Sequence, residues 1–111
     1  MDLHVSSSAE AGRQVVTLTG SVDLASRALL TDAVKTAVAD SDVTGIVLDL
    51  SGVEFIDSTG LGAVVESAGM AEDSSRNFAL RSPSPRVSRI LELTGLAEQW
   101  TIEDGGESRP A

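Results

Sequence analysis

The sequence predicts an α/β domain with a mixed sheet whose later strands run parallel. Short β-branched or apolar runs alternate along the chain with longer segments in which apolar residues recur at helical spacing. The first two runs are separated by a tight turn only, which is typical of an antiparallel hairpin. Right-handed crossovers through helices make the later strands parallel. With 111 residues and 41% hydrophobic content, the chain has the size and apolar content of one domain.

The first elements are the two strands of the hairpin and a helix. Residues 3–7 alternate apolar and polar side chains, as a half-buried strand does, and residues 9–13 form the turn. Residues 15–19 are rich in β-branched side chains and form a second strand that ends at Gly20. From about residue 25 to residue 39 the apolar positions fall on one face of a helix.

A buried strand and a second helix follow. Residues 46–50 are nearly continuous apolar sequence, too short for a helix, which predicts a central strand buried on both faces. Residues 51–54 predict a turn, and residues 55–56 a short apolar pair. A second helix is predicted from about residue 59 to residue 72 because its apolar positions again mark one face.

The last elements are two short strands around a third helix. Residues 77–81 predict a strand, and the Ser-Pro pair at 84–85 supplies an N-cap and a proline at the first helical position. Gly95 stops this helix, and residues 100–103 form a last strand. Residues 104–111 have no apolar anchor and predict a flexible tail.

The amino-acid composition argues against several classes of function for residues 1–103, the predicted domain. The chain has no Cys and no Tyr, and its one His, His4, falls in a predicted edge strand. The chain therefore lacks the residues needed for disulfides, thiolate metal sites, a Cys nucleophile or a His-based triad. We expect no enzymatic activity, no metal and no cofactor. The net charge of −9 repels phosphate backbones, which argues against direct nucleic-acid binding.

Neither membrane insertion nor export is expected from the sequence. No apolar stretch approaches the roughly 18–20 residues that span a bilayer. Residues 1–4 lack the basic region and apolar core of a signal peptide. We therefore expect a cytoplasmic protein.

The segment that carries the chemistry is the start of the second helix. Ser58 or Thr59 is predicted at the N-cap, where a side-chain oxygen accepts a hydrogen bond from a free backbone N–H and an anion is tolerated. Gly60 and Gly62 fall in the first turn, where each costs about 1 kcal/mol relative to Ala. Two such residues at a helix start suggest that something approaches its backbone closely.

Two interpretations of this segment follow from ordinary capping and charge. In the first, Asp57 and Ser58 simply cap the helix, and the glycines allow close packing. In the second, Ser58 is a phosphoacceptor whose phosphate adds about 1.5–2 negative charges beside Asp57. If that surface docks on a partner, two like charges roughly 6 Å apart at an effective dielectric constant near 20 cost on the order of 3–5 kcal/mol. Phosphorylation would then act on docking far more than on folding.

A third interpretation places the phosphoryl group on Asp57, as in a receiver domain. Asp49 and Asp23 could then supply oxygen ligands for Mg²⁺, although no acidic pair follows the first strand. A hydrolase that uses Ser58 as its nucleophile is disfavoured, because the segment offers no His base.

Residues 47–62 closely resemble the signature of STAS domains, the sulfate transporter and anti-sigma factor antagonist family. Residues 18–23 resemble that family's Gly-x-x-Asp segment, and residues 84–91 followed by 94–96 resemble its last helix and exit. The resemblance spans nearly the whole chain and is greatest to the stand-alone anti-anti-sigma factors. It implies the STAS fold, a single-layer mixed sheet of four or five strands with helices packed against it.

The resemblance also implies a function and a set of site residues. In that family the serine or threonine after the motif aspartate is phosphorylated by an anti-sigma factor that is itself a serine kinase of GHKL type. The unphosphorylated protein binds this kinase and frees the sigma factor, and a serine phosphatase reverses the modification. Ser58 matches the acceptor, with Thr59 as the alternative. The residues expected to contact the partner are Asp23, Asp57, Ser58, Thr59, Gly60, Leu61 and Gly62.

Two points stay open within the resemblance. Asp23 either shapes the kinase-facing surface or is a turn residue before the first helix. STAS domains also serve as adaptor subunits of stress-sensing complexes or lipid-transport ATPase complexes, which is the alternative function.

Overall fold

The structure, a computed structural model, describes residues 2–103 and contains one five-stranded sheet with the strand order β1-β2-β3-β4-β5. β1 pairs antiparallel with β2, and all the other neighbours are parallel, as predicted. The elements are β1 (His4–Glu10), β2 (Arg13–Val22), α1 (Arg27–Val38), β3 (Gly45–Ile56), α2 (Ser58–Asp73), β4 (Asn77–Arg81), α3 (Pro85–Leu93), the short 3₁₀ helix η1 (Leu96–Glu98) and β5 (Thr101–Glu103). The tail predicted over residues 104–111 lies outside the described residues.

The β1–β2 hairpin turns through Ala11 and Gly12, both of which have positive φ. Two such residues between strands are the signature of a type I′ turn, whose twist matches that of the flanking strands. β2 does not end at Gly20 as predicted but continues to Val22. Gly20 is required there because a Cβ atom would lie 2.0 Å from the Asp2 carbonyl oxygen.

β3 is longer than predicted, and the turn expected over residues 51–54 is wrong. The strand runs on to Ile56, with two shifts in its register against β2. Each shift opposes one extra β3 residue to β2, as β-bulges do. Gly52 allows the close contact at the first shift, because a Cβ atom there would lie 2.9 Å from the Thr19 hydroxyl oxygen.

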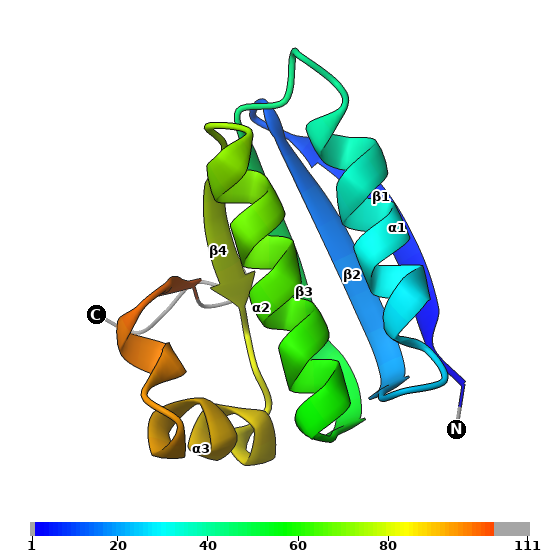
Figure 1. Ribbon diagram of the computed structural model, residues 1–111, viewed down its shortest axis with the longest axis vertical. Helices are drawn as coiled ribbons and strands as arrows, with labels where there is room; N and C mark the ends of the chain where they lie inside the picture. Colours follow the sequence, from blue (N-terminus) through cyan, green and yellow to red (C-terminus); the bar gives the residue numbers. More distant parts are fainter. Residues whose placement is uncertain (1, 104–111) are drawn as a thin grey trace.

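Helices α1 and α2 lie side by side over one face of the sheet (Figure 1). Aliphatic side chains from this face and from the helices form the main core, to which α3 contributes Val87 and Leu91. Leu48, Leu18 and Leu30 are among its fully buried members. The helix over residues 84–95 is confirmed, with Ser84 as N-cap, Pro85 at the first position and Gly95 beyond its end at φ 79°.

On the other face of the sheet, which we call the open face, a charged cluster covers a small apolar patch. Val15, Val47 and Ala79 are in register on adjacent strands and are buried. The charged cluster consists of Glu10, Arg13, Arg81 and Glu103, from four different strands.

Arg81 and Arg13 each pair with both carboxylates of this charged cluster. The Arg81 guanidinium donates hydrogen bonds to Glu10 (2.6 Å) and to Glu103 (3.3 Å), and its side chain is only 10% exposed. Arg13 donates to Glu103 at 2.6 Å. Hydrogen bonds from the arginines lower the pKa of both carboxyl groups below their ordinary values.

At the β4 and β5 edge, the Phe78 and Trp100 rings meet edge to face, with centroids 5.6 Å apart. The predicted last strand is confirmed, starting at Thr101. Within residues 2–103, none of the helices has the length and the apolar character that crossing a membrane requires.

Candidate functional site

The start of α2 is built around Asp57, which is the N-cap residue. Its carboxylate Oδ1 accepts a hydrogen bond from the Gly60 N–H at 2.8 Å. The prediction that Ser58 or Thr59 is the cap is therefore wrong by one or two positions, and the interpretation with Asp57 as a cap is confirmed. Because Asp57 satisfies the free N–H, Ser58 becomes the first helical residue, and it is exposed.

Gly60 allows the start of α2 to pack closely against the end of β2. A Cβ atom at this position would lie 1.9 Å from the Val22 carbonyl oxygen, so only glycine allows the approach. The same carbonyl accepts a hydrogen bond from the Asp57 N–H at 3.3 Å. A Cβ atom at Gly62, in contrast, would meet nothing within 4 Å, and this residue is exposed. Packing within the chain therefore explains Gly60 but not Gly62.

Asp23 forms a tight turn immediately after β2. Its carboxylate accepts a hydrogen bond from the Ser26 N–H (3.1 Å), and its own N–H donates to the Ser26 hydroxyl (3.0 Å). That hydroxyl in turn donates to the Ser21 carbonyl oxygen (2.8 Å). The interpretation of Asp23 as a turn residue before α1 is thus confirmed.

The sheet brings these two acidic residues to one edge. Val22 and Ile56 are in register at the carboxyl ends of the parallel strands β2 and β3. Asp23 and Asp57 directly follow them, so both lie at the same end of the sheet. We call this region, with the start of α2, the switch edge.

Exposed apolar side chains accompany the switch edge. Leu24, Leu29 and Phe55 are 69%, 52% and 44% exposed, although side chains of this size are ordinarily buried. Phe55 was part of the segment singled out in the sequence, whereas Leu24 and Leu29 were missed. Their positions could have indicated that they are exposed. Leu24 lies in the turn before α1, and Leu29 is next to the buried face of α1 and not on it.

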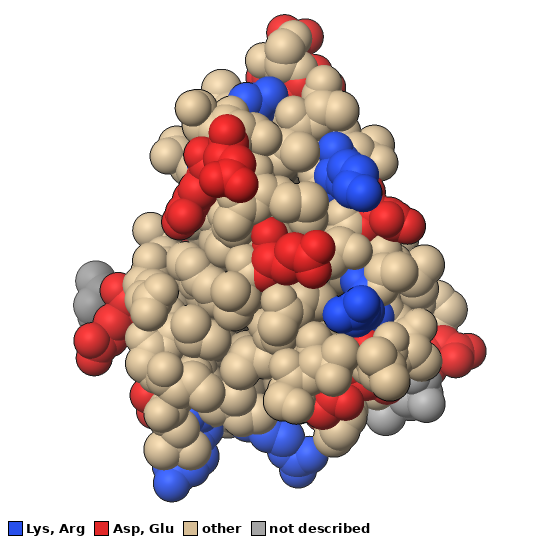
Figure 2. Space-filling model, in the orientation of Figure 1, with Lys and Arg blue, Asp and Glu red and all other residues tan. Residues whose placement is uncertain are grey.

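A cavity of about 540 Å³ opens beside Asp23. It is lined by Asp2, Leu3, His4, Asp23, Ala25, Ser26 and Leu29. The helix-covered face carries interspersed acidic and basic side chains with uncharged areas between them (Figure 2). The switch edge therefore combines exposed apolar surface, two carboxylates and an open cavity, which suits docking of another molecule.

The three carboxylates that a receiver-like site needs do not come together. Asp49 lies between two core residues of β3 and points to the open face, where it accepts hydrogen bonds from the Ser51 N–H and hydroxyl. Asp23 and Asp57 are each engaged in a turn or cap. Within the described part of the chain, no group of three or more metal-ligating side chains is placed to hold an ion.

Comparison with known proteins gives consistent matches over almost the whole chain. The family model described as "Mlab, STAS domain" matches residues 5–103. The anti-sigma F factor antagonist of Paenibacillus polymyxa is 26% identical over 94% of this chain and 89% of its own length.

Two solved structures share the fold. An anti-sigma factor antagonist from Mycobacterium paratuberculosis is 27% identical, with a TM-score of 0.81 over 92% of this chain and 86% of its own. The anti-sigma factor antagonist SpoIIAA of Bacillus, in its unphosphorylated form, is 25% identical, with a TM-score of 0.77 over 94% of this chain and 90% of its own. The five-stranded mixed sheet with its helices is the fold that these proteins have in common with this chain.

Proposed function

The chain belongs to the STAS domain family, and from this premise we propose that it is an anti-sigma factor antagonist controlled by phosphorylation of Ser58. The observation that carries the proposal is the exposed hydroxyl-bearing residue at the first position of α2, directly after a capping aspartate. Relatives named anti-sigma factor antagonists support the role, and SpoIIAA has been solved in both an unphosphorylated and a phosphorylated form.

The position of Ser58 explains how a phosphate would act. The helix N-terminus offsets added negative charge by about 0.3–1 kcal/mol, so α2 need not unfold. The phosphate would stand next to the Asp57 carboxylate, and Asp23 lies at the same end of the sheet. When a partner covers this surface and excludes water, the like charges oppose each other more strongly. Phosphorylation would then release the partner and leave the domain folded.

The partner contact would use the surroundings of Ser58 as well. Leu24, Leu29 and Phe55 supply apolar area that a partner could bury. Gly62, the fifth residue of α2, leaves its exposed position without a side chain, so that a partner can approach the backbone there. We also propose that Thr59, Gly60 and Leu61 lie within this contact, although Gly60 itself is buried.

The partner expected for this surface is an anti-sigma factor that is also a serine kinase of GHKL type, with a serine phosphatase restoring the unmodified form. In this scheme Ser58 is the substrate of another protein's catalysis and the chain itself is no enzyme. Because transcription takes place in the cytoplasm, an antagonist that frees a sigma factor would act there.

Incubation with a cognate anti-sigma kinase and ATP tests the proposal. Wild-type protein and Thr59→Ala should be labelled, and Ser58→Ala should not; Thr59→Ala is the matched control because it removes the neighbouring hydroxyl. Ser58→Asp should lower affinity for the kinase by tenfold or more. Labelling of Ser58→Ala at the wild-type level, together with full binding of Ser58→Asp, would sink the idea. Loss of the label in hydroxylamine would point to an acyl phosphate on Asp57 instead.

A second candidate is an adaptor subunit of a stress-sensing or lipid-transport ATPase complex. The matching family model is described as "Mlab, STAS domain" and not as an antagonist, and for this reason we retain this second candidate. It predicts stable co-purification with a scaffold or an ATPase, and no loss of binding in Ser58→Asp.

A further inference from the structure

The edge strand β1 lacks the features with which sheet edges are usually protected. Within residues 2–103 it is the terminal strand of the sheet, and it is exposed along its length except for Val5 and, before it, Leu3. Edges are commonly blocked by Lys, Pro or a bulge. The segment His4–Glu10 contains no Lys, Arg or Pro, and its register with β2 runs without a shift. A straight strand with small side chains is thus presented for pairing.

The hairpin determines which backbone groups face outward. Glu10 and Arg13 flank the two-residue turn and therefore exchange hydrogen bonds with each other. Because inward and outward residues alternate, the N–H and C=O groups of Val5, Ser7 and Ala9 point away from β2. These are the groups that another strand would meet.

The side chains of β1 are self-complementary in an antiparallel arrangement. If Ser7 pairs with Ser7 of a second copy, Val5 falls opposite Ala9, and Ser6 falls opposite Ser8. Each His4 then faces Glu10 of the other chain, a donor against a carboxylate that is 47% exposed. In this register Val5, Ser7 and Ala9, whose backbone groups point away from β2, pair with residues of the same set in the second copy. The pairing that suits the side chains is therefore also the one that allows backbone hydrogen bonds.

We propose that β1 is a homodimer interface, in which two copies pair through β1 to form one continuous sheet around a twofold axis at Ser7. The interface is isologous, since the same strand serves both chains. The observation that carries the proposal is the match between the free edge of β1 and its own sequence read backwards.

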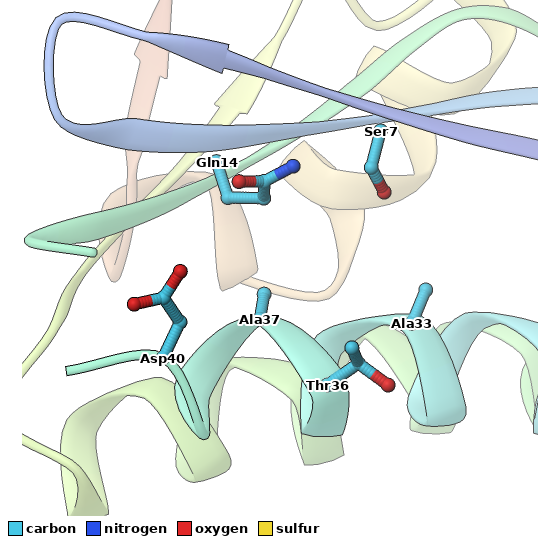
Figure 3. Close-up of a pocket in the computed structure, with 6 residues that line it drawn as sticks. All are labelled: Ser7, Gln14, Ala33, Thr36, Ala37 and Asp40. Carbon is cyan, nitrogen blue, oxygen red and sulfur yellow. The ribbon is translucent and has the colours of Figure 1, made fainter. Parts of the chain in front are cut away.

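The neighbouring helix leaves room for this pairing. A cavity of about 160 Å³ lies between the hairpin and α1, lined by Ser7, Gln14, Ala33, Thr36, Ala37 and Asp40. Figure 3 shows the Ser7 and Gln14 side chains reaching toward α1, which opposes them with the methyl groups of Ala33 and Ala37. Small side chains on both sides keep this flank of β1 open, so that α1 does not cover the edge.

The dimer leaves the start of α2 free, although His4, which takes part in the pairing, also lines the cavity beside Asp23. An antiparallel pairing turns the second copy through half a turn, so the two switch edges point in opposite directions. Each copy could then engage its own partner. Pairing along a single strand gives a small interface, so we expect weak association, with a Kd on the order of 10 µM to 1 mM.

Sedimentation equilibrium of the full chain from about 10 µM to 1 mM, in roughly 0.15 M salt to screen the net charge, tests the proposal. The wild-type chain should pass from monomer to dimer. Ser7→Pro removes an outward N–H, which an edge strand tolerates, and should remain monomeric. Ser7→Thr keeps that N–H and serves as the control. Circular dichroism verifies that each variant is folded.

Charge variants at His4 provide a test that does not depend on proline. His4→Lys should tighten the dimer and His4→Glu should loosen it, each by roughly three- to tenfold. Gln99→Lys and Gln99→Glu make the equivalent side-chain charges at an exposed position away from β1 and should shift Kd by less than about twofold. A chain that stays monomeric at 1 mM, or a dimer unaffected by both Ser7→Pro and the His4 variants, would overturn the proposal.

Discussion

The switch edge and the open face of the sheet hold their charges in opposite ways. On the open face, Glu10 and Glu103 are paired with Arg81 and Arg13. All the ion pairs found within residues 2–103 belong to this cluster. At the switch edge, the carboxylates accept hydrogen bonds from backbone N–H groups. The charges of the open face are therefore neutralised, whereas the switch edge, where we propose docking, remains negative. We expect the ion pairs of the open face to act mainly on stability and the carboxylates of the switch edge mainly on binding.

The largest expected effect on stability lies at the switch edge itself, at Gly60. Gly60→Val places side-chain atoms against the Val22 carbonyl oxygen, and neither backbone can yield without separating α2 from β2. We expect a loss of at least about 3 kcal/mol in the free energy of unfolding, measured by urea denaturation. Gly62→Ala is the matched control, and it should stabilise the helix by about 0.5–1 kcal/mol. Equal effects at both positions would contradict the packing described for Gly60.

Arg81→Met tests the open face. The substitution keeps most of the apolar stem but removes the guanidinium that Glu10 and Glu103 share, so that both carboxylates keep only Arg13 as a partner. Because both carboxylates can regain water, we expect a moderate loss of about 1–2 kcal/mol, again measured in urea. Binding to an anti-sigma factor should be unchanged when the variant is folded. A loss of binding without a loss of stability would contradict the separation of the two regions.

Acid should weaken the charged cluster of the open face. Hydrogen bonds from Arg81 and Arg13, and the attraction of their charges, lower the pKa of Glu10 and Glu103 in the folded state, so the folded state binds fewer protons than the unfolded state near pH 4.5. Their contribution to stability is present above that pH and is lost as the pH falls through the lowered values. Urea midpoints between pH 6 and pH 3 should therefore decline, and Glu103→Gln should flatten the decline. An unchanged slope in Glu103→Gln would contradict this origin.

Variants of Asp57 distinguish its role as the N-cap of α2 from the effect of its charge on partner binding. Asp57→Ala should cost about 1 kcal/mol of stability, because the Gly60 N–H loses its acceptor. Asp57→Asn keeps an acceptor at the N-cap and should cost less, while removing the charge beside Ser58. If phosphate acts by repulsion beside Asp57, Ser58→Asp should weaken partner binding less in the Asp57→Asn background. Calorimetric titration of the four combinations measures this coupling.

The smallest expected effect on stability is at Leu24, whose side chain is mostly exposed. Leu24→Ser should change the free energy of unfolding by less than about 0.5 kcal/mol, yet weaken partner binding by an amount that titration can resolve. Val65→Ser is a matched control, since Val65 is also an exposed aliphatic residue but lies further along α2. Equal loss of binding in both variants would argue against the switch edge as the contact.

Much of the fold could be predicted from the sequence because its signals are local. The turn before β2, the Ser-Pro pair that begins α3 and the Gly that ends it each act through neighbouring residues. The apolar run of β3 indicates burial on both faces without reference to any partner strand. The position of the switch edge could be predicted for the same reason, since helix starts have a recognisable chemistry.

What only the tertiary structure decided involves residues distant in sequence. Residues 51–54 have the composition of a turn, but β2 supplies hydrogen-bonding partners that keep them in a strand. Asp57, rather than Ser58, became the cap because Gly60 packs against Val22 and thereby sets where α2 begins. Arg81 meets Glu10 across 71 positions of sequence, a pairing that no local pattern could indicate. Local chemistry thus indicated the segment in which we propose the site, and long-range packing determined which of its residues are exposed.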